Sequence, residues 1–374
     1  MSSQHYFAPQ LFDGDNWHSE VYFTVHNGKI EHLNHAVDNA KVLTGMVVPG
    51  FIDVQVNGGG GGFFNAEQSV SCLAQIVQAH AKFGSTGLMP TLITDRVEVM
   101  ERAADATAQA IAAKQPGVLG IHFEGPHLSG PKKGTHSEQY LRPISEQEFA
   151  IYARQDLGIK MVTLAPETVP LDDIKRLIDL GVKVSIGHSN ADYETAERAL
   201  QVGVDGFTHL FNAMSPFTSR EPGVVGAALW HDHSWCGLIV DGHHVHPQSA
   251  RLAIRSKQRG KVMLVTDAMP PVGTDATEFD FFDGRKVIRT GDRLNSTTGE
   301  LAGSVLDMAS AVKNSVNTLQ LSLAESLRMA SLYPAQYLGL ETKGHLRSGA
   351  DADFVVLNQD LEAELTVIAG EQVG

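Results

Sequence analysis

Eight short apolar runs, rich in valine, isoleucine and leucine, alternate with amphipathic segments through the middle of the chain. The apolar runs cover residues 46–55, 87–93, 118–124, 160–165, 182–187, 206–209, 236–240 and 261–266. Apolar residues recur at helical spacing in residues 69–83, 96–114, 171–180, 193–202 and 247–259. Near-continuous apolar strands are typical of a parallel sheet that helices cover on the outside. The eight strand–helix units therefore predict an α/β fold, a (β/α)8 TIM-like barrel.

The two ends of the chain carry a different pattern, in which short alternating stretches meet at turns. Residues 20–25 and 29–33 flank Asn27-Gly28, a pair that favours a two-residue hairpin turn. Residues 353–358 and 363–369 form a similar pair near the C-terminus. Neither end holds enough apolar surface to fold alone. We therefore expect residues 1–45 and 346–374 to form one small β-sandwich domain beside a barrel of residues 46–345. The alternative is a pair of independent hairpins at the edge of the barrel.

The segment after the eighth apolar run is irregular and interrupts the barrel pattern. Residues 274–299 predict a β-hairpin insert centred on Asp283-Gly284. Helical spacing then resumes in residues 304–319 and 323–338. Ser322 and Glu325 are spaced as a capping box, which predicts the start of the last helix.

Length, cysteine use and charge narrow the possible classes of function. A chain of 374 residues with 43% hydrophobic residues can bury a large core. It has no run of 18 apolar residues, and its first ten residues lack basic and apolar signal regions, so we expect neither a membrane span nor a signal peptide. Cys72 and Cys236 are expected to be buried thiols of a cytoplasmic protein. The net charge of -14 disfavours nucleic acid as a partner, and an anionic substrate would need a local cationic pocket.

Four of the apolar runs end in side chains that can bind a metal or transfer protons. His188 and His209 lie 21 residues apart, about one strand–helix unit, and two other runs end at Glu124 and Asp267. The carboxyl ends of the barrel strands meet at one mouth, so these side chains should face a common point. One glutamate and two histidines form a three-ligand set that leaves a position for water. A single strand-end histidine is more often a core residue, but the four together predict a metal-dependent hydrolase with Asp267 handling the protons of the water.

The first apolar run contains Pro49-Gly50-Phe51-Ile52-Asp53 and closes with Gln55, and Asn57 follows it. It resembles the opening of the amidohydrolase superfamily, in which a His-x-His pair occupies the positions of Gln55 and Asn57. Because amides are poor ligands beside imidazole, the site that such a pair would build is expected to be empty, which leaves one metal. The order of the other motifs closely resembles the N-acetylglucosamine-6-phosphate deacetylase family. These motifs lie at residues 90–94, 122–126, 132–136, 164–167, 187–190, 208–214, 220–223, 241–244, 266–268 and 301–304.

This resemblance implies a role for each of the strand-end residues. Glu124, His188 and His209 would hold one divalent metal ion, with zinc as the first expectation and iron as the alternative. Asp267 would act as the general base towards water and then as the acid towards the leaving amine. His136 would donate a hydrogen bond to the acetyl carbonyl, although its sequence context alone also fits a loop histidine.

The resemblance also implies which residues contact the rest of the substrate. Arg220 and His244 would bind a phosphate group, since an arginine can donate two parallel hydrogen bonds to it. On its residues alone, Arg220 could equally form a surface ion pair with Glu221. The other expected contacts are Thr135, Asn212, Ala213, Leu301, Ala302 and Gly303.

Together these roles describe the removal of the acetyl group from N-acetyl-D-glucosamine 6-phosphate, which gives D-glucosamine 6-phosphate and acetate in amino-sugar catabolism. The resemblance further implies a homodimer in which Arg220 reaches the phosphate pocket of the neighbouring subunit. One alternative is an amidohydrolase that acts on a cyclic amide or on another N-acetyl sugar. Arg220 and His244 disfavour a neutral cyclic amide as the substrate, because such a substrate has no phosphate for them to bind. The other is a barrel that has lost its chemistry, which the four strand-end residues disfavour.

Overall fold

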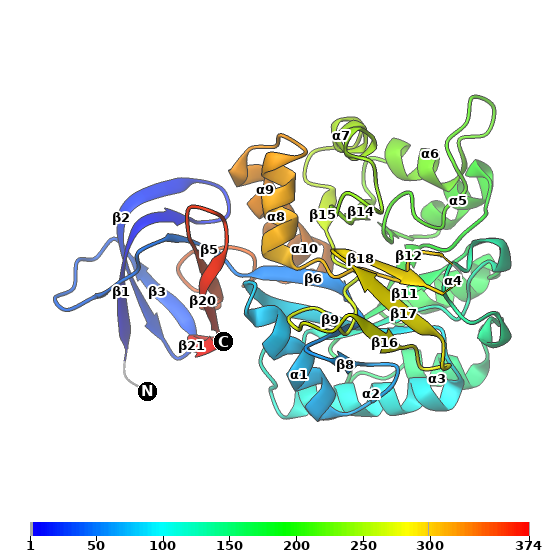
Figure 1. The fold of residues 1–374 in the computed structure, drawn as a ribbon, viewed down its shortest axis with the longest axis horizontal. Helices are drawn as coiled ribbons and strands as arrows, with labels where there is room; N and C mark the ends of the chain where they lie inside the picture. Colours follow the sequence, from blue (N-terminus) through cyan, green and yellow to red (C-terminus); the bar gives the residue numbers. More distant parts are fainter. Residues whose placement is uncertain (1–2, 298, 374) are drawn as a thin grey trace.

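The computed structural model describes residues 3–297 and 299–373. It consists of a barrel with helices on its outside and a smaller strand-rich domain that contains both chain termini (Figure 1). The predicted fold class is confirmed. No helix in the described ranges is long and apolar enough to cross a membrane.

The barrel is a parallel sheet whose strands follow one another in chain order. Its strands are β6 (Phe51–Val56), β9 (Ser85–Ile93), β10 (Gly120–Glu124), β11 (Ile159–Leu164), β12 (Val182–Ile186), β13 (Gly206–Phe207), β14 (Trp235–Leu238) and β15 (Val262–Leu264). The sheet closes just past β15, where Val56 and Ala268 form a parallel bridge. This closure brings the end of the first barrel strand next to the end of the last, where the predicted site lies.

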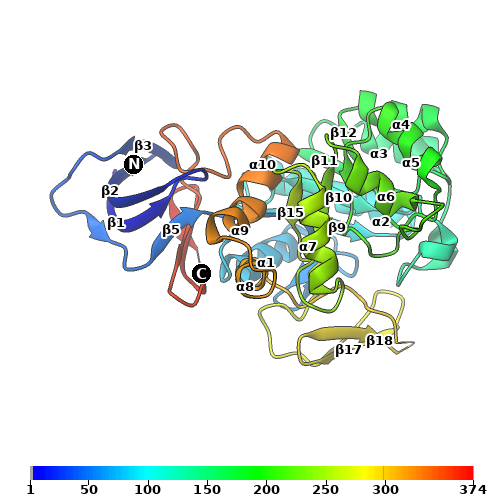
Figure 2. The same cartoon turned by 90° about the horizontal axis from the view of Figure 1, so that it is seen from above.

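Helices cover the outside of the barrel and bury their apolar faces against it (Figures 1 and 2). They are α1 (Val70–Ala81), α2 (Val97–Ala112), α3 (Glu146–Tyr152), α4 (Leu171–Asp179), α5 (Tyr193–Gln201), α6 (Gly223–Trp230), α7 (Pro247–Ser256), α8 (Met308–Asn317), α9 (Leu323–Ala330) and α10 (Leu332–Leu338). The single helix expected over residues 323–338 is divided at Ser331. Pro334 explains the break, because its ring has no N–H to donate to the carbonyl of Ala330 and would clash with it.

The strand-rich domain is one sheet assembled from both ends of the chain. Its strands are β1 (Gln4–Phe12), β2 (Trp17–His26), β3 (Lys29–Leu33), β4 (Lys41–Val42), β5 (Met46–Pro49), β19 (Phe354–Leu357), β20 (Ala363–Ile368) and β21 (Glu371–Val373). The single strand expected over residues 46–55 is therefore two strands, with β5 in this sheet and β6 in the barrel. They separate at Gly50, where an added Cβ would lie 2.2 Å from side-chain atoms of Thr86, so no larger residue fits.

The insert after β15 forms a small three-stranded antiparallel sheet beside the barrel mouth. Its strands are β16 (Glu278–Asp280), β17 (Lys286–Thr290) and β18 (Arg293–Ser296), and the turn between β16 and β17 contains the predicted Asp283-Gly284. Figure 2 shows this sheet set off from the body of the barrel. Its buried residues Phe281, Val287 and Leu294 pack with Phe63 of the short strand β8 (Gly62–Phe63), which follows β7 (Gly58–Gly59).

The cap predicted at the last helical segment is only half formed. The Ser322 hydroxyl accepts a hydrogen bond from the Glu325 N–H at 3.3 Å. The Glu325 carboxylate, however, accepts from Arg259, Arg328 and Tyr333. A complete capping box occurs instead at Ser145 and starts α3. Cys72 and Cys236 are buried free thiols, as predicted.

Candidate active site

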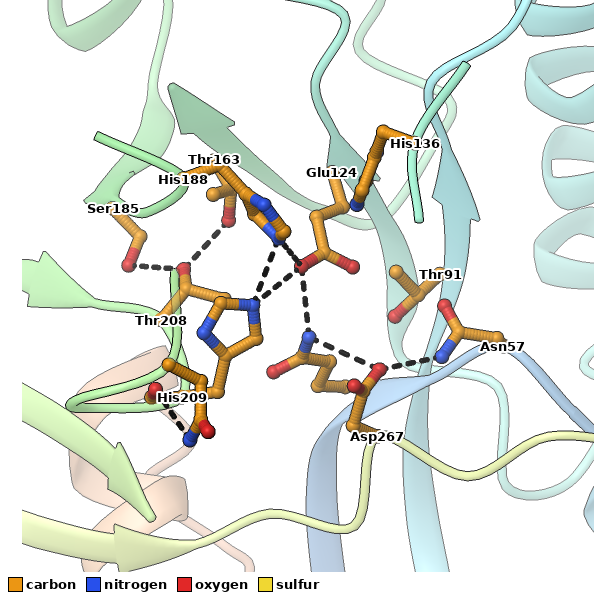
Figure 3. A network of polar contacts seen from close by, with 12 residues as sticks. Asn57, Thr91, Glu124, His136, Thr163, Ser185, His188, Thr208, His209 and Asp267 are labelled. Carbon is orange, nitrogen blue, oxygen red and sulfur yellow. Dashed lines mark hydrogen bonds and ion pairs between the residues drawn. The ribbon is translucent and has the colours of Figure 1, made fainter. Parts of the chain in front are cut away.

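The four strand-end residues meet at the carboxyl end of the barrel. Glu124 is the last residue of β10, whereas His188, His209 and Asp267 lie two or three residues past β12, β13 and β15. The backbone φ angles of these last three are 48°, 35° and 52°. Left-handed backbone at a residue other than glycine costs about 1 kcal/mol or more and is concentrated at functional sites. Here it turns each side chain from the strand direction into the mouth of the barrel (Figure 3).

Glu124, His188 and His209 form a buried cluster whose ligand atoms converge. The Glu124 Oε1 atom lies 2.9 Å from His209 Nε2 and 3.2 Å from His188 Nε2, and the two Nε2 atoms are 3.0 Å apart. The His188 Nδ1–H donates to the Lys132 carbonyl at 2.9 Å, which leaves Nε2 as the free ligand atom. Burial alone would raise the pKa of Glu124, but its contacts with the rings of His188 and His209 hold it well below its usual range. Glu124 is therefore an anion at neutral pH.

This cluster fits a divalent metal ion. Ligand atoms about 2.1 Å from a tetrahedral metal lie roughly 3.4 Å from one another, close to the three distances found here. One carboxylate and two imidazoles are also the ligand types that zinc and iron accept. Three protein ligands would leave a fourth position open to water or substrate.

Asp267 lies beside the cluster as a second buried carboxylate. Its Oδ1 accepts hydrogen bonds from Asn57 Nδ2 at 2.6 Å and from Gln55 Nε2 at 3.3 Å. The same Gln55 nitrogen donates to Glu124 Oε1 at 3.0 Å, so it joins the two carboxylates. Burial, with the negative charge of Glu124, raises the pKa of Asp267 to about 6. A carboxylate with such a pKa can accept a proton near neutral pH and return it.

His136 faces the cluster from the loop after β10. Its ring lies 4.3 Å, centroid to centroid, from the ring of His188. Its Nδ1 lies 2.8 Å from the Thr94 hydroxyl and accepts from the Thr94 N–H at 3.4 Å. Burial and the neighbouring His188 hold the pKa of His136 well below its usual range, so the ring is neutral. With Nδ1 accepting, the proton belongs on Nε2, which can donate to a substrate carbonyl.

A layer of polar side chains from neighbouring barrel strands lies next to the cluster, and Figure 3 shows three of its members, Thr163, Thr208 and Ser185. The His122 Nε2 lies 2.7 Å from the Thr163 hydroxyl, which lies 2.7 Å from the Thr208 hydroxyl, and Thr208 donates to Ser185 at 2.8 Å. Burial lowers the pKa of His122 to about 4. The layer is thus uncharged at neutral pH. It therefore supplies no positive charge to neutralise Glu124, whose negative charge can attract a cation.

The cluster opens into a cavity of about 500 Å³. Apart from the four strand-end residues, the sequence-predicted residues that line it are Thr135, His136, Asn212, Ala213, His244, Leu301 and Gly303. The buried carboxylate of Asp241 holds His244 in place, with His244 Nδ1 2.6 Å from Asp241 Oδ2. Two predicted residues do not line the cavity: Ala302 is fully buried and Arg220 is exposed.

Arg220 lies on the exposed segment that leads into α6. It forms no ion pair within the described part of the chain. The surface pair with Glu221 is absent, because the Glu221 carboxylate instead accepts the N–H groups of Tyr193 and Gly223 at 2.8 and 2.9 Å. Two large apolar side chains are exposed in this part of the chain: Phe217 within the segment, with 65% of its surface exposed, and Trp230 at the end of α6, with 76%.

Comparison with known proteins gives consistent matches over most of the chain. Residues 46–373 match the model of the Amidohydrolase family. An N-acetylgalactosamine-6-phosphate deacetylase of Shewanella sp. (strain ANA-3) is 51% identical, over 88% of this chain and 84% of its own. An N-acetylglucosamine-6-phosphate deacetylase of Bos taurus is 40% identical, over 88% of this chain and 83% of its own. The crystal structure of N-acetylglucosamine-6-phosphate deacetylase from Pasteurella multocida superimposes with a TM-score of 0.94 at 33% identity, covering 98% of this chain and 99% of that one.

The chain belongs to the amidohydrolase family. The predicted resemblance to the deacetylases of this family is confirmed, and so is the prediction of a hydrolase. Amidohydrolases depend on a metal, and this one carries a buried three-residue cluster suited to hold it.

Several residues of this amidohydrolase site were not predicted as site residues. Asn57 donates a hydrogen bond to Asp267 and lines the cavity. The cavity is also lined by Lys132, Lys133, Phe281 and Glu300. A signal for Asn57 was present in the sequence, because it occupies a position at which the superfamily carries a metal-ligand histidine. Phe281 gave no such signal, because the insert that carries it reaches the cavity only through tertiary packing.

Proposed function

We propose that this amidohydrolase removes the acetyl group of N-acetyl-D-glucosamine 6-phosphate, which yields D-glucosamine 6-phosphate and acetate in cytoplasmic amino-sugar catabolism. The observation that carries the proposal is the position of Asp267, a buried carboxylate beside a three-ligand cluster at the floor of one cavity. Relatives of that activity support it, among them a Mycobacterium smegmatis mutant in complex with N-acetyl-D-glucosamine-6-phosphate, at 29% identity and a TM-score of 0.92.

Each residue of the site has a task in this reaction. A divalent metal held by Glu124, His188 and His209 would lower the pKa of water and polarise the acetyl carbonyl. Asp267 accepts the proton of the attacking water, and its raised pKa lets it pass that proton to the departing nitrogen. The His136 Nε2–H donates to the carbonyl oxygen, which becomes negatively charged as the tetrahedral carbon forms.

We propose that the site holds one metal ion per chain, with zinc expected first and iron as the alternative. Gln55 and Asn57 support this stoichiometry because their side-chain nitrogens face carboxylates as hydrogen-bond donors. Amides are poor metal ligands beside imidazole, and these two present their NH2 groups to Glu124 and Asp267, so they act as hydrogen-bond donors where a histidine pair would bind a second cation. The intact cluster and the adjacent Asp267 disfavour the alternative of a barrel that has lost its catalytic activity.

We also propose that the substrate phosphate is bound by His244 and by an Arg220 from a second copy of the chain. Arg220 is an exposed cation outside its own cavity, and Phe217 in the same exposed segment is a large apolar side chain open to solvent, as is typical of a surface that packs against another subunit. Mixing Arg220→Ala chains with His188→Ala chains tests this arrangement. Hybrid dimers should regain one working site, whereas hybrids without any recovery would exclude the cross-subunit contact.

A second candidate substrate is N-acetyl-D-galactosamine 6-phosphate. The relative from Shewanella sp. (strain ANA-3), 51% identical, is named for that sugar, whereas the relative from Bos taurus, named for the glucosamine compound, is 40% identical. The two sugars differ only in the configuration at carbon 4, away from the amide that the cluster would face.

Acetate release from four compounds tests both substrates: the 6-phosphates of the two N-acetylhexosamines and their unphosphorylated forms. A higher kcat/KM for the glucosamine phosphate supports the first candidate, and a higher value for the galactosamine phosphate supports the second. Release without any preference for the phosphorylated sugars would contradict both.

A further inference from the structure

Asn57 is fixed directly opposite Asp267 by the closure of the barrel. Its backbone N–H donates to the Ala268 carbonyl at 2.9 Å, and the Asp267 N–H donates to the Gln55 carbonyl at 3.0 Å. These two bonds flank the parallel bridge between Val56 and Ala268. The Asn57 side chain, with only 1% of the residue exposed, points at the Asp267 carboxylate (Figure 3).

The chemistry of Asp267 decides which end of the Asn57 amide faces it. An ionised carboxylate can only accept hydrogen bonds, so the amide must present its NH2 group, and its Nδ2 lies 2.6 Å from Asp267 Oδ1. The Asn57 Oδ1 atom therefore points away from Asp267.

That oxygen is buried and has no hydrogen-bond partner. Leaving a buried acceptor without a donor is costly, so a partner is expected to reach it in the working state. Asn57 lines the cavity together with Glu124, His188, His209 and Asp267, so the donor can come from a molecule in that cavity. Gln55 also has a buried acceptor without a partner, but it does not line the cavity.

We propose that Asn57 is a catalytic residue that binds the scissile amide. Its Nδ2 holds Asp267, and its Oδ1 accepts a hydrogen bond from the N–H of the acetamido group, the one donor that this group has. Both contacts come from one side-chain amide, so they place the nitrogen that leaves beside the carboxylate that protonates it.

Asn57 gains and loses no proton in this scheme. The bond from the water oxygen to the acetyl carbon forms, the carbon–nitrogen bond breaks, and the proton that Asp267 took from water passes to the nitrogen. This inference rests on the proposed amide hydrolysis, because it assigns the donor to the amide of that substrate.

A comparison of an amide with an ester tests the contact with the N–H. N-acetylglucosamine 6-phosphate has the N–H, whereas 2-O-acetylglucose 6-phosphate has an oxygen in its place. In Asn57→Ala, kcat/KM should fall about a hundredfold for the amide and about tenfold for the ester, since only the amide loses a bond to substrate. In Asn57→Asp, which keeps an acceptor but sets a second carboxylate against Asp267, both should fall by a similar factor. Asn57→Ser, measured in parallel, gives the same truncation if the alanine variant folds poorly.

Binding to metal-free protein provides a second readout without turnover. By calorimetry, Asn57→Ala should weaken binding of N-acetylglucosamine 6-phosphate about tenfold and leave glucose 6-phosphate, which has no acetamido group, unchanged. Asn65→Ala is the matched control, because Asn65 is a buried amide that donates to the Ile93 carbonyl at 2.9 Å and does not line the cavity. It should lower the melting temperature without changing the amide-to-ester ratio.

Equal losses for amide and ester in the truncated variants, or unchanged calorimetric binding, would overturn the role of Asn57. A wild-type enzyme that releases no acetate from any N-acetylhexosamine 6-phosphate would instead overturn the proposed function, whatever the variants do.

Discussion

Replacement of Asp267 by asparagine separates the chemistry of the site from its structure. The Asp267 carboxylate is buried, and its Oδ1 accepts from Asn57 at 2.6 Å and from Gln55 at 3.3 Å. An asparagine has nearly the same shape, and its Oδ1 can still accept both bonds. The substitution therefore removes the proton acceptor while it leaves the packing around it in place.

The expected loss follows from the proton transfers that Asp267 performs. General acid–base catalysis contributes about 10²- to 10⁴-fold to a rate, which corresponds to roughly 2.7–5.4 kcal/mol in the activation free energy. The raised pKa of about 6 places Asp267 where this contribution is large, because it is mostly ionised at pH 7 and still basic. We expect kcat of Asp267→Asn to fall at least about a hundredfold, with substrate affinity largely kept.

Acetate release and calorimetric binding on the same preparation measure the two effects, with the metal content and the melting temperature as controls. The wild-type rate should fall as the pH drops through about 6, because the protonated form of Asp267 cannot accept a proton. Residual activity of Asp267→Asn should lack this acid limb. Near-normal turnover in the variant, or an unchanged acid limb, would show that another group is the base.

Three further predictions concern the metal, the phosphate and the core. Purified protein should hold one tightly bound metal equivalent by elemental analysis, and His188→Ala or His209→Ala should lose it together with activity; two equivalents that resist dialysis would contradict the one-metal site. Arg220→Ala should weaken binding of the 6-phosphorylated sugar about 10- to 100-fold and barely affect the unphosphorylated sugar, with Arg102→Ala, an exposed arginine on α2, as the control. Leu264→Ala should lower the free energy of unfolding by about 2–5 kcal/mol in denaturant titrations, since Leu264 is fully buried in β15.

The barrel could be predicted because its signal is repeated along the chain. Each strand has to bury both faces, so each appears as an apolar run, and the helices between them keep one apolar stripe. What could not be predicted depends on single contacts. The division of residues 46–55 into two strands at Gly50 follows from pairing with distant segments, since β5 pairs with β1 and β19 whereas β6 pairs with β9. The break at Ser331 had a local cause in Pro334, which the apolar periodicity of residues 323–338 obscured.

The candidate site divides in the same way. The carboxyl ends of barrel strands converge at one mouth regardless of the conformation of the loops. The proximity of Glu124, His188, His209 and Asp267 could therefore be expected from the topology. Their left-handed backbone, which turns three of them into the mouth, has only a weak signature in residue type, since histidine and aspartate are enriched at positive φ but adopt it at few of their positions. The polar layer of His122, Thr163, Thr208 and Ser185 was not predicted either. Those positions lie within apolar runs, where a polar residue has no visible partner until the strands are paired.

The replacement of a ligand histidine pair by Gln55 and Asn57 changes more than the number of metals. A second cation within hydrogen-bonding reach of Asp267 would lower the pKa of its carboxyl strongly. The carboxylate would then be a weak base and would seldom be protonated at pH 7, so it would be a poor proton donor to the departing amine. The Asn57 amide is a neutral donor that orients the same carboxylate, while burial and the charge of Glu124 raise the pKa of Asp267 to about 6. A carboxyl with that pKa is able both to accept the proton of water and to return it to the nitrogen. The two amides thus suit a site in which one carboxylate performs both proton transfers beside a single metal.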